Sequence, residues 1–296
     1  MKNKIPRTLL ITGASGFLGR NFLNSIKKKK YNIIVVTTNK KNKVFKKMAY
    51  KSVKKFDYSK KDLIRISRIK NIFGIIHLST AYGRKNNNKN YIYNANYDSP
   101  LKLFKIINKD NLNFFLNTDT YYERNLALPN GLREYVKSKK DFVKTMRRIC
   151  LNESFNFINC IIHHMYGPND SDDKFIPSMV KRLKKNEKII DLTKGNQKKD
   201  FIHVKDVSSA IIKIIETHTI FNNIENDYEI GSNKSYSIKY VMIKLKNILR
   251  SKSKLNFGAI DSISNEKHIY KANCKNLFKI GWKPKIDINK GLENFK

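Results

Sequence analysis

Three glycines after the first apolar segment constrain the fold more than any other feature of this sequence. Residues 8–12 (TLLIT) have the composition of a buried strand, and Gly13, Gly16 and Gly19 follow at intervals of three. The first glycine permits a tight turn, the second lets the backbone approach a pyrophosphate, and the third allows close helix packing. Because free N–H groups at a helix N-terminus bind anions, the sequence predicts a dinucleotide site at this turn.

Apolar segments alternate with amphipathic segments through the first half of the chain. Strands are expected at 8–12, 32–37, 73–78, 114–117 and 157–162, and helices at 17–28, 61–69, 100–108 and 134–151. Such alternation is typical of a parallel sheet covered on both faces.

The fold class is therefore α/β, a Rossmann-type doubly wound parallel sheet with a smaller C-terminal substrate-binding lobe. We expect residues 1–165, with about 200–218, to form the dinucleotide-binding domain, because the chain should return to the sheet near 200–216. Residues 166–199 and 219–296, where the pattern loosens, should form the substrate lobe.

The residues after the second expected strand bear on which dinucleotide binds. NAD sites usually carry an acidic residue there that binds the ribose 2′-hydroxyl, whereas this chain has Thr38, Asn39, Lys40 and Lys41. Arg20, directly after the last glycine, adds a further cation. We expect NADP(H), with NAD(H) as second choice. The alternative is that the two lysines are ordinary surface residues of a lysine-rich chain.

Tyr135 and Lys139 are four residues apart in an expected helix, so their side chains lie on one face. A lysine cation favours the phenolate form of a nearby tyrosine and lowers its pKa. The tyrosine then exchanges a proton with a carbonyl or alcohol oxygen near neutral pH. Thr118, at the end of an expected strand, offers a hydroxyl to the same oxygen. These three are the candidate catalytic residues. The alternatives are a plain surface helix face for the pair and a turn or helix cap for Thr118.

The net charge of +37, from 61 Lys+Arg against 24 Asp+Glu, has two interpretations. A surplus of this size is typical of nucleic-acid binding, but it also follows from the Lys/Asn/Ile-rich composition of a biased genome. Because the lysines are spread along the chain without a nucleic-acid motif, we expect no nucleic-acid partner. A positive field still favours anionic ligands.

The cysteines indicate a reducing compartment, and the lengths of the apolar runs indicate that no transmembrane helix is expected. Cys150, Cys160 and Cys274 lack metal-like or redox-like spacing, and we expect no metal. No run of about 18 apolar residues suggests a transmembrane helix. The basic, briefly apolar N-terminus is interpreted as a strand and phosphate loop instead of a signal peptide, so a cytoplasmic location is expected.

Seven motifs occur in the order found in extended short-chain dehydrogenase/reductases, the NAD(P)-dependent epimerase/dehydratase proteins that act on nucleotide sugars. They are TGASGFLG, IIHLST, the segment around Thr118, YVKSK, MYGPND, DFIHVKDV and YEIGS, and the resemblance covers nearly the whole chain. It implies an NAD(P)-dependent oxidoreductase, a nucleotide-diphosphate sugar as substrate, and a homodimer formed through the helix containing Tyr135 and the one starting at Pro100.

The motifs and the resemblance together give two sets of binding residues. The cofactor-binding set is Gly13, Ser15, Gly16, Phe17, Leu18, Gly19, Arg20, Thr38, Asn39, Lys40, Asp57, Leu78, Ser79, Thr80, Asn96, Tyr135 and Lys139. Within it, Asp57 resembles the acidic residue near the adenine, and Asn96 resembles a structural asparagine. The substrate-binding set is Thr80, Tyr82, Thr118, Asp119, Thr120, His164, Lys174, Phe175, Lys181 and Lys199. Its three lysines are candidate phosphate partners, each with a plain surface lysine as the alternative.

Within this family the chain most resembles reductases of the C4 keto group of CDP- or dTDP-linked sugars. The resemblance includes GIIHLSTAYG, FFLNTDTYY, KFIPSMV, FGAI and GWKPKIDINKGLE. It implies NADPH-dependent reduction of a nucleotide-linked 4-keto-6-deoxy or 3,6-dideoxy hexose, in the synthesis of surface polysaccharide (lipopolysaccharide O-antigen) sugars.

Two alternative functions remain open: an NAD-dependent nucleotide-sugar 4-epimerase and a non-enzymatic NAD(P)-binding regulatory protein. A dehydratase is disfavoured because Thr120 stands where those enzymes carry a proton-abstracting glutamate. Thr38 and Ile161 stand where arginines are frequent in the reductases.

Overall fold

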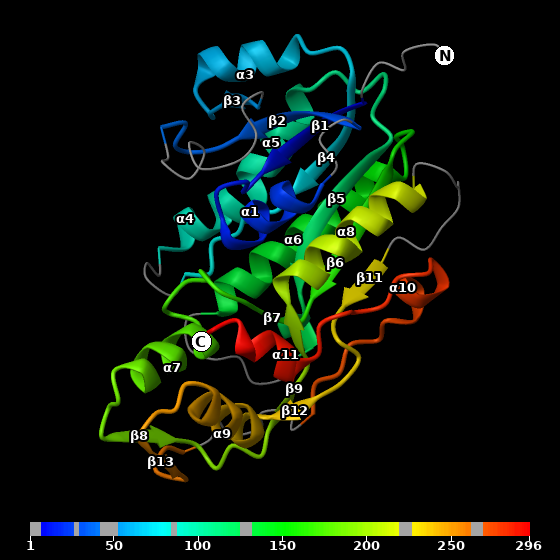
Figure 1. The fold of residues 1–296 in the computed structure, drawn as a ribbon. Helices are drawn as coiled ribbons and strands as arrows, with labels where there is room; N and C mark the ends of the chain where they lie inside the picture. Colours follow the sequence, from blue (N-terminus) through cyan, green and yellow to red (C-terminus); the bar gives the residue numbers. More distant parts are fainter. Residues whose placement is uncertain are drawn as a thin grey trace. The chain divides into compact units, whose positions relative to one another are not determined.

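A computed structural model of the chain describes residues 7–26, 30–41, 53–83, 88–124, 132–218, 227–261 and 269–296. Its largest element is a seven-stranded sheet with the strand order β11-β6-β5-β4-β1-β2-β3 (Figure 1). The strands are β1 Arg7–Thr12, β2 Tyr31–Val36, β3 Lys54–Phe56, β4 Ile72–His77, β5 Phe114–Thr120, β6 Asn156–Ile162 and β11 Asp227–Ile230. The neighbouring pairs from β3 to β5 are parallel, and the expected fold class is confirmed.

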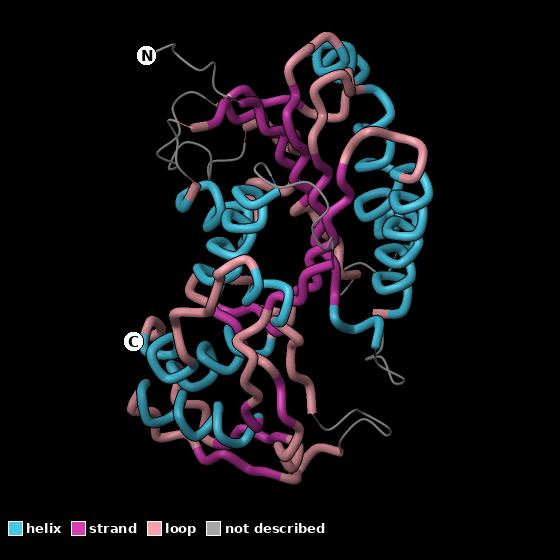
Figure 2. The backbone as a smooth tube through the Cα atoms, turned by 90° about the vertical axis from the view of Figure 1, so that its right-hand side faces the viewer, coloured by secondary structure: helices cyan, strands magenta, loops and turns pink. Residues whose placement is uncertain are grey.

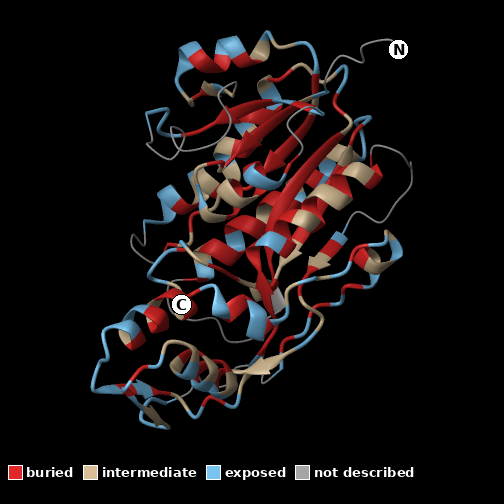
Figure 3. Ribbon diagram, viewed as in Figure 1, coloured by how far each residue is buried: buried red, intermediate tan, exposed pale blue. Residues whose placement is uncertain are grey.

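Helices cover both faces of this sheet (Figure 2), which explains why its strands are continuously apolar. The helical segments that lie between its strands in the sequence include α1 Phe17–Ser25, α3 Lys60–Ser67, α4 Lys89–Tyr93, the π-helix η1 Asn94–Asp98, α5 Ser99–Ile106, α6 Arg133–Cys150 and α8 Val204–His218. One buried cluster joins alternate strand residues such as Phe115 to Leu63, Leu103 and Phe142 of α3, α5 and α6. Figure 3 shows the burial of the strands.

Helix α6 has one apolar face and one uniformly basic face. Its buried side includes Phe142 and Met146, which fix the helix on the sheet. All of its exposed residues are cationic, at a spacing of three or four residues that keeps them on one stripe: Arg133, Lys137, Lys140, Lys144, Arg147 and Arg148. We call these six residues the α6 stripe.

The chain divides into two compact units. Unit 1 comprises residues 1–120, 131–160 and 211–228, and unit 2 comprises residues 121–130, 161–210 and 229–296. The segment at 200–216, which we expected to return to the sheet, forms β10 and most of α8. The strand that joins the large sheet after it is β11.

Unit 2 is built from three short strand pairs and several helices. β10 (Phe201–His203) pairs with β7 (His164–Tyr166), β12 (Tyr236–Ser237) with β9 (Lys198–Lys199), and β13 (Lys254–Phe257) with β8 (Ile189–Leu192). Its other helical segments are η2 Tyr121–Arg124, α7 Phe175–Lys184, α9 Ile238–Ile248, α10 Lys275–Lys279 and α11 Ile288–Glu293. A separate core containing Leu183, Leu245 and Leu292 stabilises this unit. Within the described ranges, no helix combines the length and apolarity needed to cross a membrane.

Candidate active site

The glycine turn between β1 and α1 has the backbone geometry of a phosphate loop. Gly13 has φ +70°, and a Cβ there would lie 2.4 Å from the backbone nitrogen of Ser79. A Cβ on Gly19 would lie 2.2 Å from the carbonyl oxygen of Gly13. Helix α1 begins directly after Gly16, which gives it no side-chain cap. An anionic dinucleotide therefore fits here, because the first N–H groups of α1 lack a side-chain cap.

The other residues predicted at this turn lie on or beside α1. Arg20 donates from Nη1 to the Ser15 carbonyl oxygen at 3.2 Å, so its guanidinium folds back over the turn. Phe17 and Leu18 start the helix, and Leu18 is buried.

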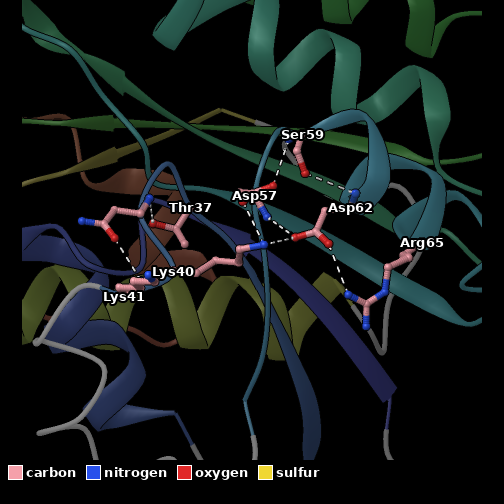
Figure 4. A network of polar contacts seen from close by, with 8 residues as sticks. Thr37, Lys40, Lys41, Asp57, Ser59, Asp62 and Arg65 are labelled. Atoms are coloured by element: carbon pink, nitrogen blue, oxygen red, sulfur yellow. Dashed lines mark hydrogen bonds and ion pairs between the residues drawn. The ribbon is translucent and has the colours of Figure 1, made fainter.

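The residues predicted to bind the adenosine end lie beside a network of charges at the ends of β2 and β3 (Figure 4). Lys40 Nζ is 2.8 Å from Asp57 Oδ2 and 2.7 Å from Asp62 Oδ2. The hydrogen bond from Lys40 holds the pKa of Asp57 and of Asp62 below the ordinary range. Arg65 contacts the other oxygen of Asp62. The ammonium that we predicted near a 2′-phosphate is therefore already shared by two carboxylates.

The loop after β2, which includes Lys40, is held by local hydrogen bonds. Asn39 N donates to Thr37 Oγ1 at 3.3 Å, and Lys41 N donates to Asn39 Oδ1 at 2.9 Å. Thr38 and Asn39 are exposed.

The loop after β4 is fixed by Asn96, a fully buried residue of the π-helix η1. Asn96 Oδ1 accepts from Ala81 N at 2.8 Å, and its Nδ2 donates to Ala81 O at 2.9 Å and to Ser138 Oγ at 3.0 Å. The asparagine thereby ties the chain beyond Leu78, Ser79 and Thr80 to helix α6. In this structure it positions the loop and the helix that carry other predicted site residues.

Thr118, Tyr135 and Lys139, the three candidate catalytic residues, are all buried in unit 1. Lys139 Nζ donates to the carbonyl oxygen of Thr118 at 2.7 Å, which joins α6 to the end of β5. Burial lowers the pKa of Lys139 to about 8, and the charge of Asp119 acts in the opposite direction. The hydroxyl of Thr118 donates to the His77 carbonyl oxygen at 3.0 Å, so it must turn to meet a reacting oxygen.

The tyrosine is enclosed by a second aromatic ring. Tyr135 has only 3% of its surface exposed, and its ring centroid lies 4.8 Å from that of Tyr82. Such a pair restricts the orientation of the phenol. Asp119 and Thr120, predicted to bind substrate, are buried at the end of β5, where Thr120 N donates to Asp119 Oδ1 at 2.8 Å.

The remaining predicted substrate residues belong to unit 2. Lys174 is 3.1 Å from Asp170, and Lys181 is 2.8 Å from Asp172. Lys199 is buried, with Nζ 4.1 Å from the ring centroid of Tyr270. His164 Nε2 lies 2.6 Å from the hydroxyl of Tyr121, and Phe175 is the first residue of α7. Two of the three predicted phosphate-binding lysines are therefore already in ion pairs.

Sequence reasoning missed several residues that shape the site. Asn159 of β6 is 2% exposed and binds Asp119, and Ser138 binds Asn96. A lone polar residue inside the apolar run FINCII was the available signal for Asn159. Asp62, three residues after the helix cap Ser59, is 2% exposed. Across the part of the chain that is described, no group of three His, Cys, Asp or Glu residues is placed to hold a metal ion.

Comparison with known proteins gave one family and several relatives. Residues 9–231 match the model of the NAD dependent epimerase/dehydratase family. The chain is 32% identical over 291 residues to CDP-abequose synthase of Salmonella typhimurium, covering 96% of both chains. It is also 32% identical over 292 residues to CDP-abequose synthase of Salmonella muenchen, covering 98% of this chain and 97% of the other.

Solved structures with the same fold include two 4-epimerases. The UDP-glucose 4-epimerase of Thermotoga maritima superposes with a TM-score of 0.80 at 16% identity. The UDP-glucuronic acid 4-epimerase of Bacillus cereus, in complex with UDP-glucuronic acid and NAD, has a TM-score of 0.81 at 19% identity. Each comparison covers 97% of both chains, and at this level of identity the likeness shows the fold.

Proposed function

This chain belongs to the NAD dependent epimerase/dehydratase family, and we propose that it reduces the C4 keto group of a nucleotide-linked 4-keto-6-deoxy or 3,6-dideoxy hexose. Membership makes it an enzyme of the NAD(P)-dependent oxidoreductase type that modifies nucleotide sugars. The Salmonella relatives are named CDP-abequose synthase. Their similarity over nearly the full length supports the finer assignment and a role in surface polysaccharide synthesis.

The contact of Lys139 with the end of β5 carries this proposal. It brings a buried ammonium and the Thr118 hydroxyl to the helix face that presents Tyr135. In the reaction, Tyr135 donates a proton to the C4 oxygen as that oxygen gains charge, and Thr118 turns from the His77 carbonyl to hold it. Lys139 favours the phenolate that remains. The nicotinamide supplies the hydride that reduces C4.

For the cofactor we propose NADP(H), with NAD(H) as the alternative. Thr38 and Asn39 follow β2 in place of the carboxylate that would bind a ribose 2′-hydroxyl and repel a phosphate. Because Lys40 is shared by two carboxylates, Arg20 is the cation that we assign to the 2′-phosphate. The glycine turn, with its bare helix N-terminus, binds the pyrophosphate.

NADPH oxidation by the purified enzyme tests the proposal directly. CDP- and dTDP-linked 4-keto-6-deoxy sugars, with and without a hydroxyl at C3, are offered with NADPH or NADH. We expect turnover with NADPH that falls at least ~10²-fold in Tyr135→Phe, since a positioned general acid contributes roughly 10²–10⁴-fold. Failure to oxidise the cofactor with every keto-sugar, together with NAD bound in the isolated protein, would contradict a reductase and indicate a 4-epimerase.

A further inference from the structure

A row of buried polar side chains crosses four neighbouring strands of the large sheet. Thr12, His77 and Asn117 are in register on β1, β4 and β5, and Asn159 lies on the adjacent strand β6. Thr12 Oγ1 lies 2.7 Å from His77 Nδ1, and Asn117 Nδ2 donates to Asn159 Oδ1 at 2.9 Å. All four have at most 2% of their surface exposed. Most polar groups buried this deeply have a hydrogen-bond partner, but His77 Nε2 and Asn117 Oδ1 have none among the described residues.

The row ends at the carboxylate of Asp119. Asn159 Nδ2 donates to Asp119 Oδ2 at 3.0 Å, and Thr120 N donates to Asp119 Oδ1 at 2.8 Å. Asn159 presents its amide nitrogen to the carboxylate, while its amide oxygen accepts from Asn117. Each oxygen of Asp119 thus accepts from an N–H group, and such bonds favour the ionised form of the carboxyl group.

Lys139 of helix α6 approaches this end of β5. Asp119 and Asn117 share one face of β5 with Phe115, and Phe115 packs on Phe142 of α6, with ring centroids 5.7 Å apart. Helix α6 therefore delivers Lys139 to the same face, where its Nζ binds the carbonyl oxygen of the residue before Asp119.

Two other titratable groups belong to the elements around this ammonium. His77 comes from β4. Burial, and then the charge of Lys139, hold its pKa well below the usual range, so the imidazole is neutral. Tyr135 comes from α6 itself and is the proton donor of the proposed reaction. The carboxylate whose charge favours the protonated form of Lys139 is Asp119.

We propose that Asp119 is a positioning residue, a fixed counter-charge that keeps the buried Lys139 ammonium protonated, and that Asn117 and Asn159 hold it ionised. The effect on rate rests on the proposed function, because it assumes that reduction needs the lysine cation. The role differs from protonation of a leaving hydroxyl, because Asp119 acts through Lys139.

The pH dependence of kcat/KM for Asp119→Asn tests this role. Burial already lowers the pKa of Lys139 to about 8, and an opposite charge nearby raises a lysine pKa by ~1–3 units. In the variant we therefore expect the alkaline decline in kcat/KM to move to lower pH by about one unit or more. A loss of about 10²-fold at every pH, with the decline unmoved, would show a proton donor instead.

A charge swap separates electrostatics from folding. In the double variant Asp119→Asn/Asn159→Asp, the new carboxylate at position 159 accepts from Asn117 and from the new amide at position 119, so every hydrogen bond is restored. The negative charge moves by about 4.8 Å, one strand spacing. We expect the melting temperature to return to the wild-type value. The pH midpoint of the alkaline decline in kcat/KM should stay lower than in the wild type. If both return together, Asp119 is only structural.

The lysine itself can be titrated without any substrate. In protein with ¹³C-labelled lysine, the Lys139 signal is assigned by its loss in Lys139→Arg. Its midpoint should fall by about one unit or more in Asp119→Asn, and an unchanged midpoint overturns the inference. A shifted midpoint in a protein that reduces no keto-sugar would uphold the inference and reject the proposed function.

Discussion

Single buried side chains fix the geometry on which the proposed chemistry depends. Asn96 is buried, makes three hydrogen bonds and links the loop after β4 to helix α6. Lys139 and Tyr82 similarly connect α6 to β5 and to the loop that follows β4. The positions of the catalytic groups thus depend on residues that take no part in proton transfer.

Replacement of Asn96 by alanine should destabilise the protein by about 3 kcal/mol, because the N–H and C=O of Ala81 lose their buried partner. Urea unfolding at neutral pH measures this change. Asn94→Ala is the matched control. Asn94 is exposed and accepts a single hydrogen bond, from Ser99, so its loss should cost less than about 1 kcal/mol. Equal costs for the two variants would show that the links through Asn96 add nothing.

At the scale of elements, the strand–helix units of unit 1 were predictable. The expected helix at 61–69 is observed at Lys60–Ser67, and that at 134–151 is observed at Arg133–Cys150. These elements follow from local periodicity, as does the spacing of Tyr135 and Lys139. The contacts of Asp119 with Asn159 and of Lys40 with Asp62 depend on which strands pair, and the two- to four-residue strands of unit 2 leave no periodic pattern.

Alanine substitutions at two glycines of the phosphate turn should distinguish an effect on folding from an effect on cofactor binding. Gly19→Ala places a Cβ against backbone atoms of the turn, the nearest 2.2 Å away, so we expect a clear loss of thermal stability. In Gly16→Ala the added Cβ lies 3.2 Å from its nearest atom, so we expect a smaller loss of thermal stability than in Gly19→Ala. Gly16→Ala should still weaken dinucleotide binding at least about tenfold, because its methyl group occupies the place of a phosphate. Thermal unfolding measures the loss of stability, and calorimetric titration with NADPH measures the loss of binding. Normal binding by Gly16→Ala would place the pyrophosphate elsewhere.

The ion cluster at the ends of β2 and β3 makes a prediction about cofactor preference. Because Lys40 bridges Asp57 and Asp62, we expect Lys40→Ala to weaken NADPH and NADH alike. The ratio of their kcat/KM values should then change by less than about threefold, well below the tenfold that corresponds to 1.4 kcal/mol. Arg20→Ala should lose NADPH selectively. A selective loss of NADPH in Lys40→Ala would show that this lysine leaves its carboxylates for the 2′-phosphate.

For the whole molecule, the net charge of +37 is distributed unevenly among the helices. Every exposed residue of α6 is basic, whereas α9 exposes Lys239, Ile243 and Asn247. The homodimer that family resemblance implies would use α6. In a two-fold symmetric pair the same surface meets itself, so the α6 stripe would face, or lie beside, a second stripe.

Self-association of this protein should therefore strengthen as salt is added. Screening shortens the range of repulsion from about 10 Å at 0.1 M ionic strength to about 3 Å at 1 M. Sedimentation velocity at both salt concentrations measures the dimer fraction. Lys137→Glu/Lys144→Glu should associate more strongly at low salt, while Lys239→Glu, on α9, should not. A dimer that dissociates with added salt would place the interface on another surface.

The buried row from Thr12 to Asp119 has a consequence for how this sequence can evolve. Asn117, Asn159 and Asp119 each fix the orientation of the next, so a change at one leaves a donor facing a donor at its neighbour. Substitutions here should be strongly epistatic, and relatives that differ at position 159 should differ at 117 or 119 as well. Position 159 on β6 should therefore covary with positions 117 and 119 on β5, although the β5–β6 connection separates them in sequence.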